Sequence, residues 1–149
     1  MYIKNHNRFY NIDGFREITW SKNNGVPNIA VVEVIFSDTV EDAEGYNMPR
    51  SIVIDLDNTC AAAIEAGEYS RVEDIINNSA YNNYEKEEIL PLLYDLLSEK
   101  VYVYIIKQIS AGENIIDISG VIDKFIKNTL KTACGILTPA ACSVGISAK

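Results

Sequence analysis

Short apolar stretches separated by polar turns fill the first 57 residues of the chain, and this pattern is typical of antiparallel strands. The polar stretch Lys4 to Arg8 divides two such stretches, and Asp13-Gly14 is a turn dipeptide. A further break comes at Asn23-Asn24-Gly25, just before Pro27. We therefore predict strands at the following positions: Tyr2 and Ile3, Phe9 to Ile12, Ile29 to Phe36, and Ser51 to Leu56, with the apolar residues Phe15, Ile18 and Trp20 in the same antiparallel region.

Ile29 to Phe36 is the best candidate for a central strand, because β-branched residues dominate it and only Glu33 interrupts the apolar run. The residues from Ser37 to Arg50 are mostly polar, and we predict that they form a loop before the next strand.

Helical spacing replaces strand alternation after Asp57. Ala61 to Ala66 favours a helix that stops at Gly67, and Ser70 to Asn77 favours a short second helix with Ser70 as its N-cap. A longer helix is predicted over Glu85 to Glu99, where five apolar residues recur at helical spacing: Ile89, Leu92, Leu93, Leu96 and Leu97.

Pro91 is expected in the first turn of this longer helix, where its missing N–H does little harm. The stretch Val101 to Ile109 remains open, since its β-branched and aromatic content favours a strand while its position allows it to extend the helix.

A last helix is predicted from Asn114, with Gly135 as its stop. Its apolar stripe comprises Ile115, Ile118, Ile122, Phe125, Ile126 and Leu130. The small residues that follow, with Pro139 among them, suggest a loosely packed tail.

These elements predict an α+β fold, in which an N-terminal antiparallel sheet of about four to five strands is packed by C-terminal helices. At 149 residues the chain has the length of one domain that needs no disulfide or metal to stabilise its core. We expect this single domain to span residues 1–135, strand-rich over 1–57 and helix-rich over 58–135, with 136–149 as the tail.

The negative net charge of the chain disfavours some classes of binding partner. The formal charge is -8, and residues 1–100 hold 18 acidic and 8 basic side chains, whereas 101–149 hold 3 and 5. Binding to nucleic acid or to an anionic membrane is therefore not expected, because both need clustered Lys and Arg. The acidic N-terminal region serves either solubility or the docking of a basic partner protein.

The location is expected to be cytoplasmic. The N-terminal residues do not resemble a signal peptide, and the longest fully apolar run, Val101 to Ile106, is too short to cross a bilayer. Cys60, Cys134 and Cys142 are an odd number at irregular spacing, so we expect reduced thiols rather than disulfides.

The segment Val53 to Thr59 contains the most suggestive chemistry. Its apolar strand ends in Asp55-x-Asp57-x-Thr59 and resembles the first motif of the haloacid dehalogenase superfamily. The resemblance implies a parallel sheet, Asp55 as the nucleophile that attacks a phosphoryl group, Asp57 as the general acid and base, and Mg²⁺ held by both carboxylates. Ser110 could imitate the second motif, but no later acidic pair follows a strand. Under this alternative the protein is a Mg²⁺-dependent phosphatase; otherwise we expect no cofactor.

The sequence lacks the histidines that a zinc site or a Cys–His–acid arrangement would need. His6 is the sole histidine, which leaves no second histidine for a zinc site and no partner for a Cys–His pair. Cys60 follows two carboxylates that would disfavour its thiolate, so we interpret it as structural.

The C-terminal tail offers a second alternative. The stretch Thr138 to Cys142 resembles the ring-forming segments of lanthipeptide precursors, in which a dehydrated Thr is attacked by a downstream Cys thiolate. The resemblance implies that residues 1 to about 112 are a leader, with Ala111-Gly112 as the cleavage site.

The favoured hypothesis is a small non-enzymatic protein-interaction module, which by analogy suits a bacterial or phage accessory protein, including an immunity-type inhibitor of a basic toxin. Aromatic residues and acids around the start of the longer helix are the candidate contacts: Tyr81, Tyr84, Glu85, Glu87 and Glu88. A homo-oligomer is a further option.

Overall fold

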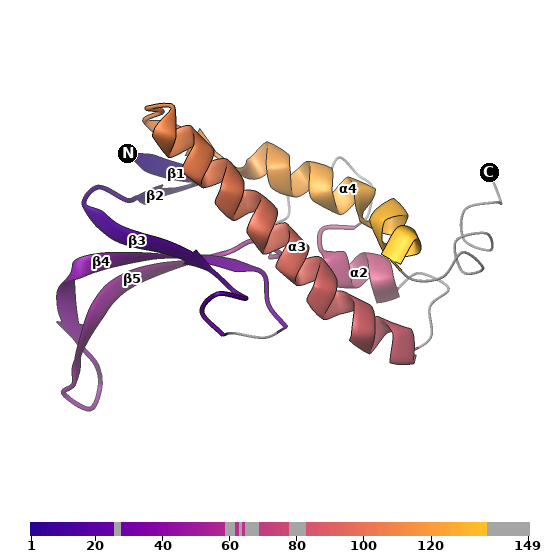
Figure 1. Cartoon of the computed structure of the whole chain (residues 1–149), viewed down its shortest axis with the longest axis horizontal. Helices are drawn as coiled ribbons and strands as arrows, with labels where there is room; N and C mark the ends of the chain where they lie inside the picture. The colour runs from indigo at the N-terminus through magenta and orange to yellow at the C-terminus, as the bar shows by residue number, and fades with distance from the viewer. Residues whose placement is uncertain (26–27, 59–61, 63, 65–68, 78–82, 137–149) are drawn as a thin grey trace.

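The computed structural model describes residues 1–25, 28–58, 62, 64, 69–77 and 83–136 (Figure 1). In chain order, the elements are β1 (Tyr2–Asn5), β2 (Arg8–Asn11), β3 (Phe15–Trp20), β4 (Val31–Glu41), β5 (Asn47–Asp55), α2 (Val72–Asn77), α3 (Asn83–Ser110), β6 (Ile115–Asp117) and α4 (Ser119–Ile136). The predicted helix Ala61 to Ala66 and the tail 137–149 lie largely or wholly outside these residues.

The strands form two three-stranded sheets. One has the order β2-β1-β6, and the other has the order β3-β4-β5 with antiparallel neighbours throughout. In the first sheet β1 pairs with β2 antiparallel and with β6 parallel. The predicted α+β class is confirmed, with the difference that the strands are divided between two sheets and one pair is parallel.

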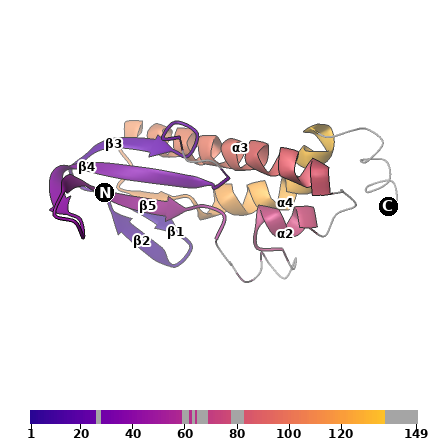
Figure 2. The same cartoon turned by 90° about the horizontal axis from the view of Figure 1, so that it is seen from below.

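The two sheets share one hydrophobic core with the helices. Side chains from both sheets meet those of α2, α3 and α4 in a single cluster, which includes Ile3, Phe36, Ile54, Leu97 and Ile122. Figure 1 shows α3 running diagonally past the strands, and Figures 1 and 2 show α4 beside α3 and α2 next to both. The core therefore lies between the sheets and the helix layer.

Helix α3 is longer than the predicted Glu85 to Glu99, and it includes all of Val101 to Ile109. Its buried side chains recur every four residues, at Ile89, Leu93, Leu97, Val101 and Ile105. Four residues advance about 40° beyond a full turn, so the buried stripe winds around the helix as α3 passes successive partners. This continuous stripe explains why the β-branched stretch is helical rather than a strand.

Two details of the predicted helix were wrong. Leu92 and Leu96 do not share the buried stripe, since they are 50% and 40% exposed. Pro91 lies inside α3 rather than in its first turn.

Residues 114–118 also differ from the prediction of one continuous helix. Ile115–Asp117 forms β6, in which Ile116 is buried while Ile115 is 54% exposed. The pairing of β6 with β1 supplies backbone hydrogen bonds that a helix at these residues could not make to the sheet. Helix α4 then includes Gly135, which is therefore not its stop.

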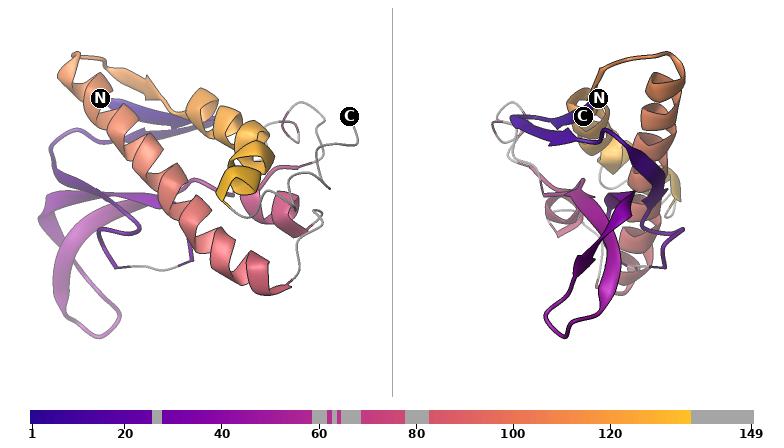
Figure 3. Two further views of the ribbon diagram at one scale, coloured as in Figure 1. Left: turned by 45° about the vertical axis from the view of Figure 1, so that its right-hand side comes forward. Right: turned by 90° about the vertical axis from the view of Figure 1, so that its left-hand side faces the viewer.

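The predicted loop Ser37 to Arg50 is mostly strand. β4 continues to Glu41 and β5 begins at Asn47, so the two strands form a ribbon that extends beyond the helices (Figures 1 and 3). The pairing register shifts between Ile35 and Thr39, which marks a bulge. At this bulge the Arg50 guanidinium lies 3.8 Å from the centroid of the Phe36 ring and donates to Asp38 at 2.7 and 3.3 Å.

None of the helices in the described part of the chain is both long and apolar enough to span a bilayer.

Candidate functional site

Asp55 and Asp57 build the turn that connects β5 to α2. The Asp57 backbone N–H donates to the Asp55 carboxylate at 3.0 Å, and the Val72 backbone N–H donates to the Asp57 carboxylate at 2.8 Å. Asp57 therefore caps the first turn of α2, a role that the sequence assigned to Ser70. The Ser70 hydroxyl instead contacts the Asp74 carboxylate at 3.4 Å.

Asp57 is a buried carboxyl group with an unusual proton affinity. Burial raises the pKa of Asp57 to about 6, against the lowering effects of the Val72 N–H and of the Tyr94 hydroxyl, which donates to it. Burial, together with the nearby Asp57 charge, also raises the pKa of Tyr94. The two side chains thus form a buried pair that links β5, α2 and α3.

The surroundings of these carboxylates differ from those that the phosphatase resemblance implies. β5 is the edge strand of an antiparallel sheet, not a strand of a parallel one. Asp55 is exposed, Asp57 is buried beneath the turn, and Thr59 lies outside the described residues. Among the residues that the structure describes, no group of three or more His, Cys, Asp or Glu side chains is placed to hold a metal ion.

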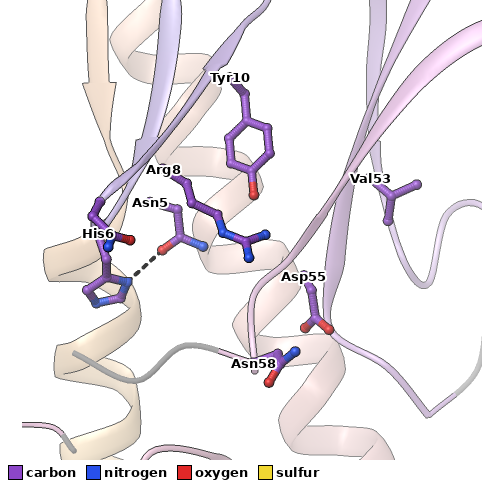
Figure 4. A pocket seen from close by; sticks show the side chains of 8 residues that line it. Asn5, His6, Arg8, Tyr10, Val53, Asp55 and Asn58 are labelled. Atoms are coloured by element: carbon purple, nitrogen blue, oxygen red, sulfur yellow. Dashed lines mark hydrogen bonds between the residues drawn. The ribbon is translucent and has the colours of Figure 1, made fainter. Parts of the chain in front are cut away.

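A polar cleft lies on one side of this turn, between the β1–β2 hairpin and the end of β5. It has a volume of about 310 Å³ (Figure 4). The lining residues are Asn5, His6, Asn7, Arg8, Tyr10, Val53, Asp55 and Asn58. A second hollow, lined in part by Asp57, Arg71 and Tyr94, shares Asp55 and Asn58 with the cleft. The turn is therefore a wall between two polar depressions.

His6 is committed to the scaffold of the cleft. It occupies the β1–β2 turn with φ 57°, and its ring nitrogens lie 2.8 Å from Asn5 Oδ1 and 2.8 Å from Asp123 Oδ1. Its backbone N–H donates to the Ser119 hydroxyl, which ties the hairpin to the start of α4. Both ring nitrogens are occupied, so the geometry does not offer His6 as a base to a bound molecule.

The end of the β4–β5 ribbon carries a second candidate surface, which we call the ribbon tip. It consists of Val40, Tyr46 and Met48 together with the acidic Glu41, Asp42 and Glu44. Val40 pairs directly with Met48 across the two strands, so their side chains share a face. The exposed fractions are 43% for Val40, 49% for Met48 and 68% for Tyr46.

The turn at the ribbon tip is tightly hydrogen-bonded. The Asp42 carboxylate accepts from the backbone N–H groups of Glu44 and Tyr46, both at 2.9 Å. The Asp42 N–H donates in turn to the Tyr46 carbonyl at 2.9 Å, and Gly45 adopts φ 88°, which favours glycine. Tyr46 is therefore displayed on an ordered turn.

The interaction residues predicted from the sequence are only partly described. Glu87 and Glu88 are exposed on the first turns of α3. Tyr81, and the side chains of Tyr84 and Glu85, lie outside the described part of the chain, as do Cys60 and Cys142. The ribbon tip was missed because its segment was interpreted as a loop, although Tyr46 and Met48 amid acidic residues were a visible signal.

The cleavage site implied by the precursor hypothesis lies in the middle of the fold. Ala111-Gly112 forms the turn between α3 and β6. Cleavage there would separate β6 and α4 from the core, to which they contribute Ile116, Ile122 and Ile126. The leader boundary near residue 112 therefore does not match the architecture.

Comparison with protein-family models, with curated proteins and with solved structures finds no match.

Proposed function

We propose that this protein is a small non-enzymatic interaction module that docks through the ribbon tip onto a basic surface of another protein. The observation that carries the proposal is an ordered turn that presents exposed apolar side chains among acidic ones. The proposed partner has an apolar pocket for Tyr46 or Met48 with Lys and Arg side chains around it.

The residue types at the ribbon tip support this proposal. Aromatic residues and methionine are enriched at the centres of protein interfaces, and a polar rim surrounds them. A tyrosine side chain buries a large area and loses little conformational freedom, because it has few rotatable bonds. Glu41, Asp42 and Glu44 provide the charged rim around these apolar contacts.

Charge supports a basic partner in particular. Residues 37–49 contain no Lys or Arg, and Arg50 at the base of the ribbon is already paired with Asp38. The hydrogen bond from Arg50 lowers the pKa of Asp38, so this pair stays charged over a wide pH range. The free acidic charge at the tip attracts Lys and Arg and accelerates encounter at low salt.

Preorganisation supports binding through the ribbon. Arg50 donates to Asp38 at the bulge, and the turn at Asp42 is hydrogen-bonded. These contacts hold the ribbon in its conformation before any partner binds. Less conformational entropy is then lost on association. A bacterial or phage accessory protein, such as an inhibitor that covers a basic toxin, would use such a surface.

Site-specific photocrosslinking in cells of the source organism tests this proposal. A photoreactive phenylalanine analogue replaces Tyr46 in one variant and Phe9, a second exposed aromatic residue on the other sheet, in the control. We expect one basic protein to be crosslinked from position 46 and not from position 9. The purified partner should bind more weakly as salt increases.

Three results would contradict the proposal. These are equal crosslinking from both positions, a crosslinked partner whose binding does not depend on salt, and a crosslink to a second copy of this chain. The last result would identify the ribbon tip as a self-association surface.

A further inference from the structure

We propose that the polar cleft between the β1–β2 hairpin and the end of β5 binds a small zwitterion, with the carboxylate of the ligand on Arg8 and its ammonium group on Asp55. A free amino acid is the simplest molecule of this class. This inference uses residues that the ribbon tip does not contain, so either proposal can fail without the other.

The cleft contains unpaired charge of both signs on its two walls. Arg8 projects from β2, and no described residue forms an ion pair or hydrogen bond with its guanidinium group. Asp55, at the end of β5, uses only Oδ1 to accept the Asp57 N–H. Figure 4 shows the Arg8 guanidinium and the Asp55 carboxylate directed into the same space from opposite walls.

A buried amide supplies the second, independent sign of a ligand. Asn5 is 5% exposed, and its Oδ1 is engaged by the His6 ring. Its side-chain nitrogen has no hydrogen-bond partner among the described residues and is directed into the cleft on the side of Arg8 (Figure 4). A buried polar group without a partner costs about 1–3 kcal/mol, and an oxygen of a bound carboxylate would satisfy it.

The donors and acceptors are divided between the walls in the way that a zwitterion requires. Arg8, the Asn5 amide nitrogen and the Tyr10 hydroxyl gather on the hairpin wall, where a carboxylate can accept from them. Asp55 faces them from the other wall and offers carboxylate oxygens to an ammonium group.

The size of the cleft limits the ligand. About 310 Å³ is at the lower end of the range for small-molecule sites, so the cleft accommodates a single amino acid rather than a nucleotide or a peptide chain. His6 is already bonded to Asn5 and Asp123 and acts by holding the Asn5 amide in position.

Titration of the full chain followed by ¹H–¹⁵N NMR tests the inference. The probes are glycine, alanine and glutamine, with acetate and inorganic phosphate as anions without an ammonium group and ethylamine as an amine without a carboxylate. We expect at least one amino acid to give saturable shifts at the Arg8 Nε–H and the Asn5 side-chain amide. Its Kd should be about 1 mM or lower, and about tenfold or more below those of acetate and ethylamine.

Two variants with a matched control locate the site. Arg8→Gln should weaken amino-acid binding about tenfold or more, whereas Arg16→Gln, at an exposed position of β3, should leave it unchanged. Asp55→Asn keeps the oxygen that accepts the Asp57 N–H, and it should remove the preference for alanine over N-acetylalanine.

Several outcomes would overturn the inference. They are the absence of saturable shifts with every amino acid tested, equal affinity for acetate or phosphate and the amino acid, and equal effects of Arg8→Gln and Arg16→Gln. Should Arg8→Gln not fold, the alanine and N-acetylalanine comparison in Asp55→Asn decides the question.

Discussion

Asp57 links three elements through one buried carboxyl group. It ends the turn after β5, caps α2 through the Val72 N–H, and accepts the hydroxyl of Tyr94 on α3. Burial raises the pKa of Asp57 to about 6 in the folded protein. Between about pH 4 and pH 6, the folded state therefore keeps a proton that the unfolded state has already released. This group therefore stabilises the fold most at low pH, and its contribution is lost as pH rises through 6.

Replacement of Asp57 by Asn should remove this pH dependence. The Asn side chain keeps an oxygen for the Val72 N–H and carries no charge to desolvate. As pH rises from 4 to 7, the difference in free energy of unfolding between Asp57→Asn and wild type should shift by about 2–3 kcal/mol in favour of the variant. Each unit of pKa difference between the folded and unfolded states corresponds to about 1.4 kcal/mol. Urea unfolding at pH 4, 5, 6 and 7 measures this difference.

Asp55→Asn is the matched control, because it removes an exposed carboxylate from the same turn. Parallel stability curves for Asp57→Asn and wild type would show that the Asp57 carboxyl group does not carry the expected pH dependence.

At the scale of elements, α3 forms much of the core through its winding stripe. Leu97 is fully buried, whereas Leu92, on the same helix, is 50% exposed. Leu97→Ala should cost about 2–5 kcal/mol of unfolding free energy through lost burial and the cavity that remains. Leu92→Ala should cost less than about 1 kcal/mol. Urea denaturation of both variants checks the expectation, and similar losses would mean that the stripe is wrongly placed.

The elements that the sequence predicted are those whose local pattern and tertiary partners agree. Val31 to Phe36 and the leucine-rich part of α3 have an apolar face that is buried in the fold. The ribbon was missed because Ser37–Glu41 is exposed and contains a single apolar residue, Val40, so no alternation is visible, although backbone pairing makes it a strand. β6 was missed because three residues are too few for alternation to outweigh the helical pattern that follows.

The candidate sites were predictable to different degrees. Asp55 ends β5 and Asp57 lies in the turn that follows, and the sequence indicated this turn because the two Asp residues come at the end of the apolar run. The cleft was not predictable, since Arg8 and Tyr10 face Asp55 and Asn58 only after β1–β2 packs beside β5. No sequence motif links residues that tertiary structure alone brings together.

At the scale of the whole molecule, the two candidate surfaces are separate. The ribbon tip lies at the far end of the ribbon, while the cleft lies where the hairpin meets the end of β5 (Figures 1 and 4). We propose that the net charge of -8 attracts a basic partner from a distance and that the ribbon tip adds local apolar contacts. Under this proposal, the overall charge drives encounter and the ribbon tip provides specificity.

The most direct test of docking through the ribbon tip is calorimetric titration of the purified partner, once crosslinking has identified it, with two charge-neutralised variants. Glu41→Gln/Glu44→Gln neutralises two acids of the ribbon tip, and Glu87→Gln/Glu88→Gln changes the net charge equally at two exposed residues of α3. We expect the ribbon variant to raise Kd about tenfold, because two charged contacts are lost, while the helix variant should change Kd less than about threefold. A larger loss from the helix variant, or equal losses from both, would contradict docking through the ribbon tip.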